Sequence, residues 1–253
     1  EAFTKALADK NALKEIPLAD YSQLFQSASV ADNHRPTIFD FIANEAIQFY
    51  SLDEQIIRKQ GAFDLSADSP VLADADEFMA WKPATEDGES YVLRAVQLYQ
   101  ALLAFHHQDA DQTAFLDVDL NRIQFANNIA SGEEKKSRYR AVLNRFASQH
   151  TKHPLSSRAL SWLAASHLAD KQYKTAHSLA TTGMTRFPDS HGGKSCADLI
   201  SQIERPELSL EAEGVWNDAK PEFTAHYRNL NKVHFRLVKF DYKKWKFGQY
   251  RSP

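Results

Sequence analysis

The sequence contains few of the residues that cross-link or interrupt a fold. Cysteine occurs once, at Cys196, which excludes an internal disulfide and any metal site built from several cysteines. Only 8 glycines and 9 prolines occur among 253 residues, and this scarcity favours helices over a loop-rich β fold. A chain of this length buries roughly 70–75% of its unfolded surface. We therefore expect it to fold without disulfides or a structural metal.

Long apolar runs are absent as well. The sequence holds no apolar stretch of 18 residues, so it predicts no transmembrane helix. It begins at Glu1 without a methionine or a signal-like segment, and we expect it to be a piece of a longer protein. The formal net charge of −3 conceals an uneven distribution, because residues 228–251 hold eight basic residues and one acidic residue, Asp241. The rest of the chain is acidic on balance.

The clearest pattern is a helical repeat between His153 and Ile203. Small or apolar residues recur at helical spacing in two stretches that Lys171-Gln172 separates. They are Leu160, Leu163, Ala164 and His167, then Tyr173, Ala176, Ala180 and Gly183. This spacing is typical of a tetratricopeptide-type helix pair, which Pro188 ends. Because one such pair cannot bury its apolar face alone, we expect further helices to stack on its N-terminal side.

Helical periodicity also predicts the elements before the repeat. Two short helices are expected within 1–30, broken at Pro17, and a core helix over 35–50 with Pro36 in its first turn. The predicted buried stripe of the core helix is Ile38, Phe41, Ile42, Ala46 and Phe49. Residues 51–84 are expected to be irregular, apart from a turn or two over 74–81.

Long helices are predicted over 86–107 and 111–130. Ser131 and Glu134 form a candidate capping box for a third long helix. A last helix is predicted over 192–203, before Pro206.

The pattern changes at Pro206. Alternation with a period of two predicts strands over 208–212, 223–227 and 233–237, with a hairpin loop at 228–231 because asparagine tolerates positive φ. The predicted fold class is mainly α: an α-solenoid, tetratricopeptide-like helical stack over 1–205, followed by a short antiparallel β segment over 206–253. Since three strands bury one face poorly, we expect the β segment to be the incomplete start of a larger sandwich, with exposed strand edges.

Four segments occur in an order that is typical of a family. They are RPTIFDFIANEAIQFY (35–50), RFPDSHGGKSC (186–196), RPELSLEAEGV (205–215) and FTAHYRNLNKVHFRLVKFDY (223–242). Together they resemble the N-terminal region of large bacterial alpha-2-macroglobulin-like proteins, in which a helical, repeat-like region precedes the first macroglobulin β-sandwich domain. Tyr227-Arg228-Asn229 resembles the connection of a strand pair that opens this domain. The resemblance covers most of the chain from Arg35 onward.

The resemblance implies a non-catalytic part of an envelope protein, periplasmic or outer-membrane associated, concerned with protease trapping or protein–protein contact. A membrane anchor would belong to the parent protein, since this chain has no apolar run long enough for one. Trapping relies on a bait region and, in many members, on a Cys-Gly-Glu-Gln thioester. Cys196 does not fit that motif, because Ala197-Asp198-Leu199 follows it and the thioester needs glutamine three residues on.

Motifs of enzymes fail on spacing. Gly193-Lys194-Ser195 matches the end of a P-loop, but the glycine required five residues before Gly193 is Pro188, which favours a helix-to-helix turn. No G-x-S-x-G nucleophile elbow occurs. Cys196 is expected to be a small buried apolar side chain rather than a nucleophile. We expect no enzymatic activity.

Histidines and carboxylates also have plainer interpretations than a metal or acid–base site. Adjacent residues on a helix point about 100° apart, so His106-His107, like His150/His153 around a turn, are interpreted as surface residues. Asp109/Asp111 and Asp117/Asp119 are spaced i, i+2 and face apart on a helix. We expect them to cap helices or face solvent, and we expect no metal or other cofactor.

The C-terminal stretch is basic and aromatic, a composition that can stack bases and neutralise phosphates. Its apolar residues alternate as core-facing strand residues do, and the acidic remainder of the chain would repel phosphate. We therefore expect no nucleic acid as a partner. The resemblance to macroglobulin-like proteins implies protein partners, with proteases among those of the full-length parent. The candidate interaction surface comprises Arg228, Lys232, Arg236, Lys239 and Trp245. The alternative function is a free-standing helical-repeat scaffold that binds peptides or proteins in a groove.

Overall fold

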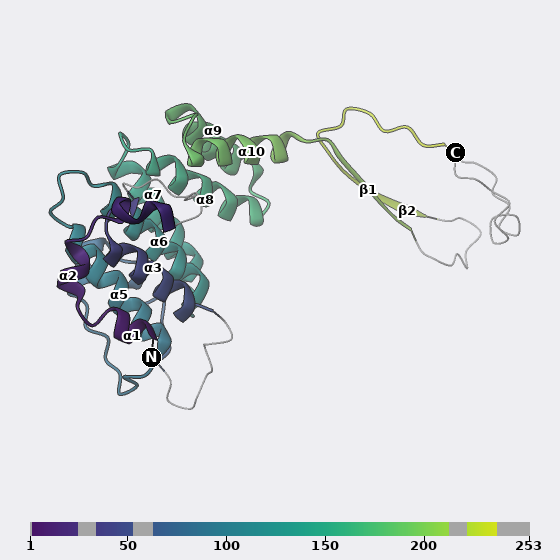
Figure 1. The fold of residues 1–253 in the computed structure, drawn as a ribbon. Helices are drawn as coiled ribbons and strands as arrows, with labels where there is room; N and C mark the ends of the chain where they lie inside the picture. Colours follow the sequence, from purple (N-terminus) through teal and green to yellow (C-terminus); the bar gives the residue numbers. More distant parts are fainter. Residues whose placement is uncertain (1, 25–33, 53–62, 213–221, 237–253) are drawn as a thin grey trace, which may run out of the picture. The chain divides into compact units, whose positions relative to one another are not determined.

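Helices joined by mostly short connections make up most of the structure. The computed structural model describes residues 2–24, 34–52, 63–212 and 222–236. The helices are α1 (Ala2–Ala6), α2 (Lys10–Lys14), η1 (Leu18–Leu24), α3 (Ile38–Tyr50), η4 (Pro70–Leu72), α4 (Ala75–Ala80), α5 (Tyr91–His106), α6 (Thr113–Ile129), α7 (Lys135–Gln149), α8 (Leu155–Ala169), α9 (Tyr173–Arg186) and α10 (His191–Glu204). Strands β1 (Glu207–Ala212) and β2 (Phe223–Arg228) follow. The predicted fold class, a helical stack followed by a short antiparallel β segment, is confirmed (Figure 1).

The chain divides into two compact units, Glu1–Ile200 and Ser201–Pro253, and the division falls inside α10. In the first unit each long helix packs on the next, from α3 through α5, α6, α7 and α8 to α9 (Figure 1). A hydrophobic core runs through this stack. Within the described residues, none of the helices combines the length and the apolar character that a membrane span requires.

The predicted repeat pair is α8 and α9. Ala164, Ala176 and Ala180 are fully buried, so small side chains let the two helices approach closely, as expected. Lys171 makes the turn between them with φ of 58°. Close packing explains the glycine at position 183, because a Cβ there would lie 2.5 Å from Cys196 Sγ on α10. Three helices therefore meet at this point.

The core position predicted for α3 is confirmed, with Ile42 and Phe49 of the predicted stripe partly buried against the core, but the most buried residues are others. The fully or almost fully buried apolar residues are Phe39, Ala43, Ala46, Ile47 and Tyr50, so only Ala46 of the predicted stripe belongs to them. Because α3 is apolar on several sides, its sequence alone does not show which side is buried. Its contacts with α5 decide this. The predicted place of Pro36 is also wrong, because the N-cap is Thr37, which forms a capping box with Asp40. Pro36 precedes the cap.

The capping box predicted at Ser131 does not form. Ser131 pairs its backbone with the segment around Ser66: its N–H donates to Leu65 O at 2.8 Å, and its carbonyl accepts from Ala67 N–H at 2.8 Å. Gly132 then turns the chain with φ of +127°. As a result α7 begins only at Lys135, after Glu134.

The two described strands form an antiparallel ladder in which Glu207 faces Arg228 and Ala212 faces Phe223. The strand predicted over 233–237 is not formed in its described part, 233–236. Asn229 adopts φ of 54°, as a turn asparagine can, but it does not close a hairpin. Its side chain instead donates to Ile203 O at 2.6 Å, at the C-terminal end of α10. The turn at Asn229 therefore contacts the end of α10, and it does not connect β2 to a third strand.

Candidate functional site

A cleft of about 870 Å³ opens along α6 in the first unit. Its lining follows a single stripe of that helix at intervals of three or four residues, from the first residue to the last. The stripe consists of Thr113, Asp117, Asn121, Gln124, Phe125, Asn128 and Ile129. Further lining comes from α3, from the residues before α3, and from the first turns of α8 and α10. The lining therefore combines apolar surface with side-chain hydroxyls, amides and charges.

A hydrogen-bonded network fixes the charged part of the cleft. Arg158 of α8 donates from Nη1 to Asp117 Oδ1 at 2.9 Å and from Nη2 to Asn121 Oδ1 at 3.0 Å. Asn121 Nδ2 donates to Asp117 Oδ2 at 2.9 Å. His34 Nδ1 lies 3.1 Å from Asp117 Oδ1. The guanidinium of Arg158 also lies over the Trp162 ring, 4.8 Å from its centroid, so its geometry is set before any ligand arrives.

Asp117 is thus buried and shared among three partners, which corrects the prediction that it faces solvent. The neighbouring Tyr99 donates its hydroxyl to Asn121 O at 3.3 Å. Burial, reinforced by the charge of Asp117, raises the pKa of Tyr99 above its ordinary value. The tyrosine therefore acts as a neutral wall of the cleft.

The N-terminus of α6 lies at one end of the stripe. Asp111 accepts there from Thr113 N–H at 2.9 Å. Asp111 precedes the N-cap, which is Gln112. Thr113 Oγ1 lies 3.1 Å from His153 Nε2. Burial lowers the pKa of His153, although the charge of Asp111 acts in the opposite direction. His153 is half-buried beside the cleft, not a plain surface residue as predicted.

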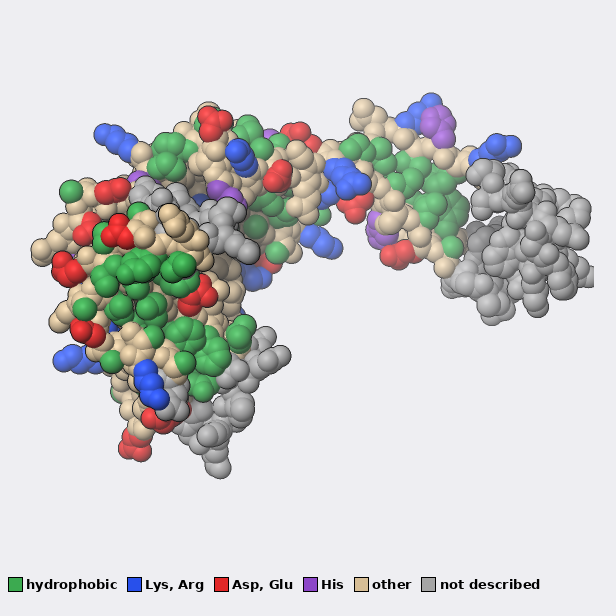
Figure 2. All heavy atoms as spheres, viewed as in Figure 1, with side chains coloured by type: hydrophobic (Ala, Val, Ile, Leu, Met, Phe, Trp, Pro, Cys, Tyr) green, Lys and Arg blue, Asp and Glu red, His purple; other side chains and the backbone are tan. Residues whose placement is uncertain are grey.

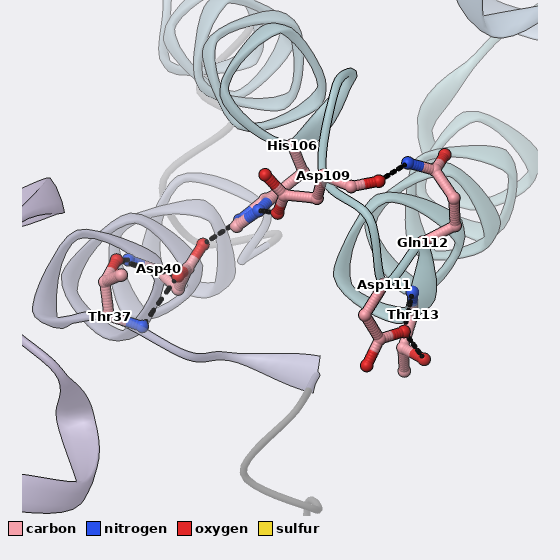
Figure 3. Close-up of polar contacts among 7 residues, drawn as sticks. All are labelled: Thr37, Asp40, His106, Asp109, Asp111, Gln112 and Thr113. Carbon is pink, nitrogen blue, oxygen red and sulfur yellow. Dashed lines mark hydrogen bonds and ion pairs between the residues drawn. The ribbon is translucent and has the colours of Figure 1, made fainter.

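His106 is the clearest departure from the sequence interpretation, because its side chain is 1% exposed. Its Nε2 lies 2.7 Å from Asp40 Oδ1 on α3, and its Nδ1 lies 2.6 Å from Asp109 Oδ2 (Figure 3). Burial alone would lower the pKa of His106, but the hydrogen bonds and charges of the two carboxylates outweigh it and raise the pKa. Since both ring nitrogens are occupied, His106 joins α3 to the end of α5 and is not placed to serve as an acid–base group.

Asp119 is also buried, whereas the sequence predicted that it faces solvent. Arg122, which is fully buried, donates to Asp119 Oδ1 from Nε at 3.0 Å and from Nη2 at 2.7 Å. The same guanidinium donates to Val71 O at 2.6 Å and to Ala73 O at 3.1 Å. The ion pair of Arg122 and Asp119 therefore connects η4 to α6 and is part of the buried core.

Cys196 and the glycines near it have structural roles. Cys196 is fully buried, which confirms the expected buried apolar side chain. This burial raises the pKa of its thiol to about 11. Gly193-Lys194-Ser195 lies in the first turns of α10, not in a turn between helices. A Cβ at Gly193 would lie 1.9 Å from Phe187 O, and one at Gly192 would lie 2.2 Å from Arg158 N. These glycines permit close backbone contact.

The predicted interaction surface is only partly described. Arg228 forms an ion pair with Glu207 at 2.9 Å across the β ladder. Lys232 and Arg236 are exposed in a segment without a strand. Lys239 and Trp245 lie outside the described residues. Among the residues described, no group of three or more histidines, cysteines or carboxylates is arranged to hold a metal ion.

Comparison with protein-family models, with curated proteins and with solved structures found no match. The resemblance to macroglobulin-like proteins therefore stays a prediction. Sequence reasoning missed the cleft, although one signal was present: polar residues recur at helical spacing through α6, a helix otherwise embedded in apolar neighbours.

Proposed function

We propose that the first unit is a non-catalytic interaction module that binds an extended segment of a partner protein along α6. The observation that carries this proposal is the cleft of about 870 Å³ with its continuous polar stripe. Side-chain hydroxyls, amides and charges recur along the whole of α6, beside apolar surface from Ile47, Phe125 and Leu155. Polar groups at this regular spacing are suited to the repeated N–H and C=O groups of a peptide backbone, and the apolar surface is suited to its side chains.

The length of the stripe sets the size of the expected ligand. The 17 residues of α6 span about 25 Å at 1.5 Å per residue. An extended chain rises about 3.3 Å per residue. We therefore expect a peptide of about seven or eight residues to follow the stripe. Side-chain amides of Asn44 and Gln48 on α3 and of Gln124 and Asn128 on α6 line its path.

The test is a selection from a synthetic library of octapeptides with free carboxyl termini, followed by fluorescence anisotropy on resynthesised binders. Gln48 and Asn128 are exposed lining residues, so Gln48→Trp and Asn128→Trp should fill the cleft without disturbing the core. Asn144→Trp is the matched control, because Asn144 is an exposed asparagine of α7 that does not line the cleft. We expect the first two variants to lose binding and the control to retain it. Equal binding by all three would refute the proposal.

A second candidate concerns the parent protein, and it is favoured by the apolar surface of the β ladder. Leu208 and Leu210 on β1 are 44% and 54% exposed, and Phe223 and Tyr227 on β2 are 53% and 65% exposed. The register places all four on one face, and Figure 2 shows exposed apolar side chains on the described part of this unit. Such a face is suited to a sandwich that further strands complete, as in the macroglobulin-like proteins that the sequence resembles.

On this proposal the chain is part of an envelope protein that traps proteases or contacts other proteins. The gene sequence downstream of the codon for Pro253 tests it first. A long continuation of alternating β segments supports the proposal, and a Cys-Gly-Glu-Gln there would make covalent trapping the mechanism to examine. If the open reading frame stops within a few tens of codons, this second candidate is refuted and the peptide-binding module remains as the proposed function. Cell fractionation of the native protein tests the envelope location.

A further inference from the structure

We infer that the segment bound in the cleft carries a carboxylate, and that Arg35 is the residue that binds it. This inference rests on the proposed peptide-binding function and adds the chemistry of the ligand. It depends on three observations: the unused hydrogen-bonding capacity of Arg35, the balance of charge in the cleft, and the helix ends that meet there.

Arg35 lines the cleft and is half-buried. Within the described part of the chain, its Nε is buried without a hydrogen-bond partner. Buried polar groups in proteins almost always have a partner, so an unpaired one needs an explanation. A ligand that supplies the acceptor provides it, since a planar guanidinium matches a carboxylate in a two-bond arrangement.

The backbone holds Arg35 in place. Pro36 O accepts from Leu18 N–H at 2.8 Å, and Ile38 N–H donates to Ile16 O at 3.0 Å. Thr37 is fixed by its capping box with Asp40, which His106 holds in turn. The segment that carries Arg35 is therefore anchored at Pro36 and at the two residues after it, and little ordering is required when a ligand binds.

The charge of the lining favours an anion. Asp117 is its only carboxylate among the described residues, and Arg158, Asn121 and His34 already surround it. Arg35 is thus the guanidinium whose charge no carboxylate of the lining balances. The first residues of α8 and α10 also line the cleft. Leu155 N–H already donates to His153 Nδ1 and Gly193 N–H to Ser190 Oγ, so these ends favour negative charge through the helix dipole alone. The N-terminus of α6 contributes less, because the carboxylate of Asp111 already accepts from Thr113 N–H there.

The inference can be tested on the octapeptides selected above. Each binder is resynthesised with its carboxyl terminus amidated and, separately, with each Asp or Glu replaced by the corresponding amide, which distinguishes a terminal from a side-chain carboxylate. Arg35→Gln is compared with Arg138→Gln, a matched control in which an exposed arginine loses its exposed partner Asp68. Because Arg35 Nε has no hydrogen-bond partner among the described residues, we expect Arg35→Gln to keep the melting temperature of the wild type.

We expect one of the two peptide changes to abolish most of the binding, and Arg35→Gln to weaken binding of the parent peptide roughly tenfold or more. Arg138→Gln should bind as the wild type does. Binders that tolerate both peptide changes, or that bind Arg35→Gln with unchanged affinity, would overturn the carboxylate inference and leave the proposed function standing. A library that yields no cleft binder would overturn both.

Discussion

Replacing Arg122 by methionine should cost about 3–5 kcal/mol of unfolding free energy. The substitution removes two donors from Asp119, which is 8% exposed, and leaves the carbonyls of Val71 and Ala73 without the guanidinium. Removing one partner of a buried ion pair typically costs about 3–5 kcal/mol, because the remaining charge is stranded. In a domain of about 200 residues each kcal/mol lowers the melting temperature by about 2–4 °C. The midpoint should therefore fall by about 6–20 °C.

The assay is urea unfolding followed by helical circular dichroism at pH 7. Arg138→Met serves as the control, because the exposed pair of Arg138 and Asp68 should contribute at most about 1 kcal/mol. The double variant Arg122→Met/Asp119→Leu should recover part of the loss, since it no longer leaves a buried charge unpaired. A loss under about 1 kcal/mol for Arg122→Met, or a double variant no more stable than the single one, would refute this reasoning.

Three further predictions concern other buried groups. The pKa of His106 is raised in the folded state, so its stabilising contribution is complete below the unfolded pKa of about 6.5 and is lost as the pH rises through the folded pKa. The stability gap between wild type and His106→Gln should therefore narrow as the pH rises, and a constant gap would contradict this. Gly192→Ala should cost about 1–3 kcal/mol because its Cβ meets the backbone of α8, whereas Gly88→Ala, with nothing within 4 Å, should change stability by less than about 0.5 kcal/mol; urea unfolding measures both. Cys196, with its pKa near 11, should react with a thiol-specific disulfide reagent at pH 8 only as fast as the protein unfolds, so fast labelling of the native protein would contradict its burial.

The sequence was most informative where the determinants are local. Spacing and small side chains predicted the pair α8 and α9, and Ala164 and Ala176 are buried as that pattern requires. Alternation predicted β1 and β2. In both cases the pattern lies within about thirty consecutive residues. Periodicity can predict such elements because it depends only on residues that are close in the sequence.

Prediction failed where a polar residue has a partner far along the chain. Asp40 interrupts the apolar pattern of α3, yet it is buried because His106, 66 residues later, pairs with it. Arg122 donates to Val71 O, 51 residues earlier. Ser131 resembles a helix cap in isolation but pairs with the segment around Ser66. The cleft follows the same rule, since only the stripe on α6 is visible in the sequence and the other walls come from distant helices.

The turn at Asn229 has a practical consequence for dissecting the chain. The amide of Asn229 donates to the carbonyls of Ile203 and Arg205, and Arg228 donates to that of Gln202. The exposed carbonyls at the end of α10 thus depend on residues more than twenty positions later. A fragment cut near residue 205 would lose these donors, and the last turn of its final helix would fray into water. Amide hydrogen exchange should accordingly report the end of α10 and the β ladder as one cooperative segment.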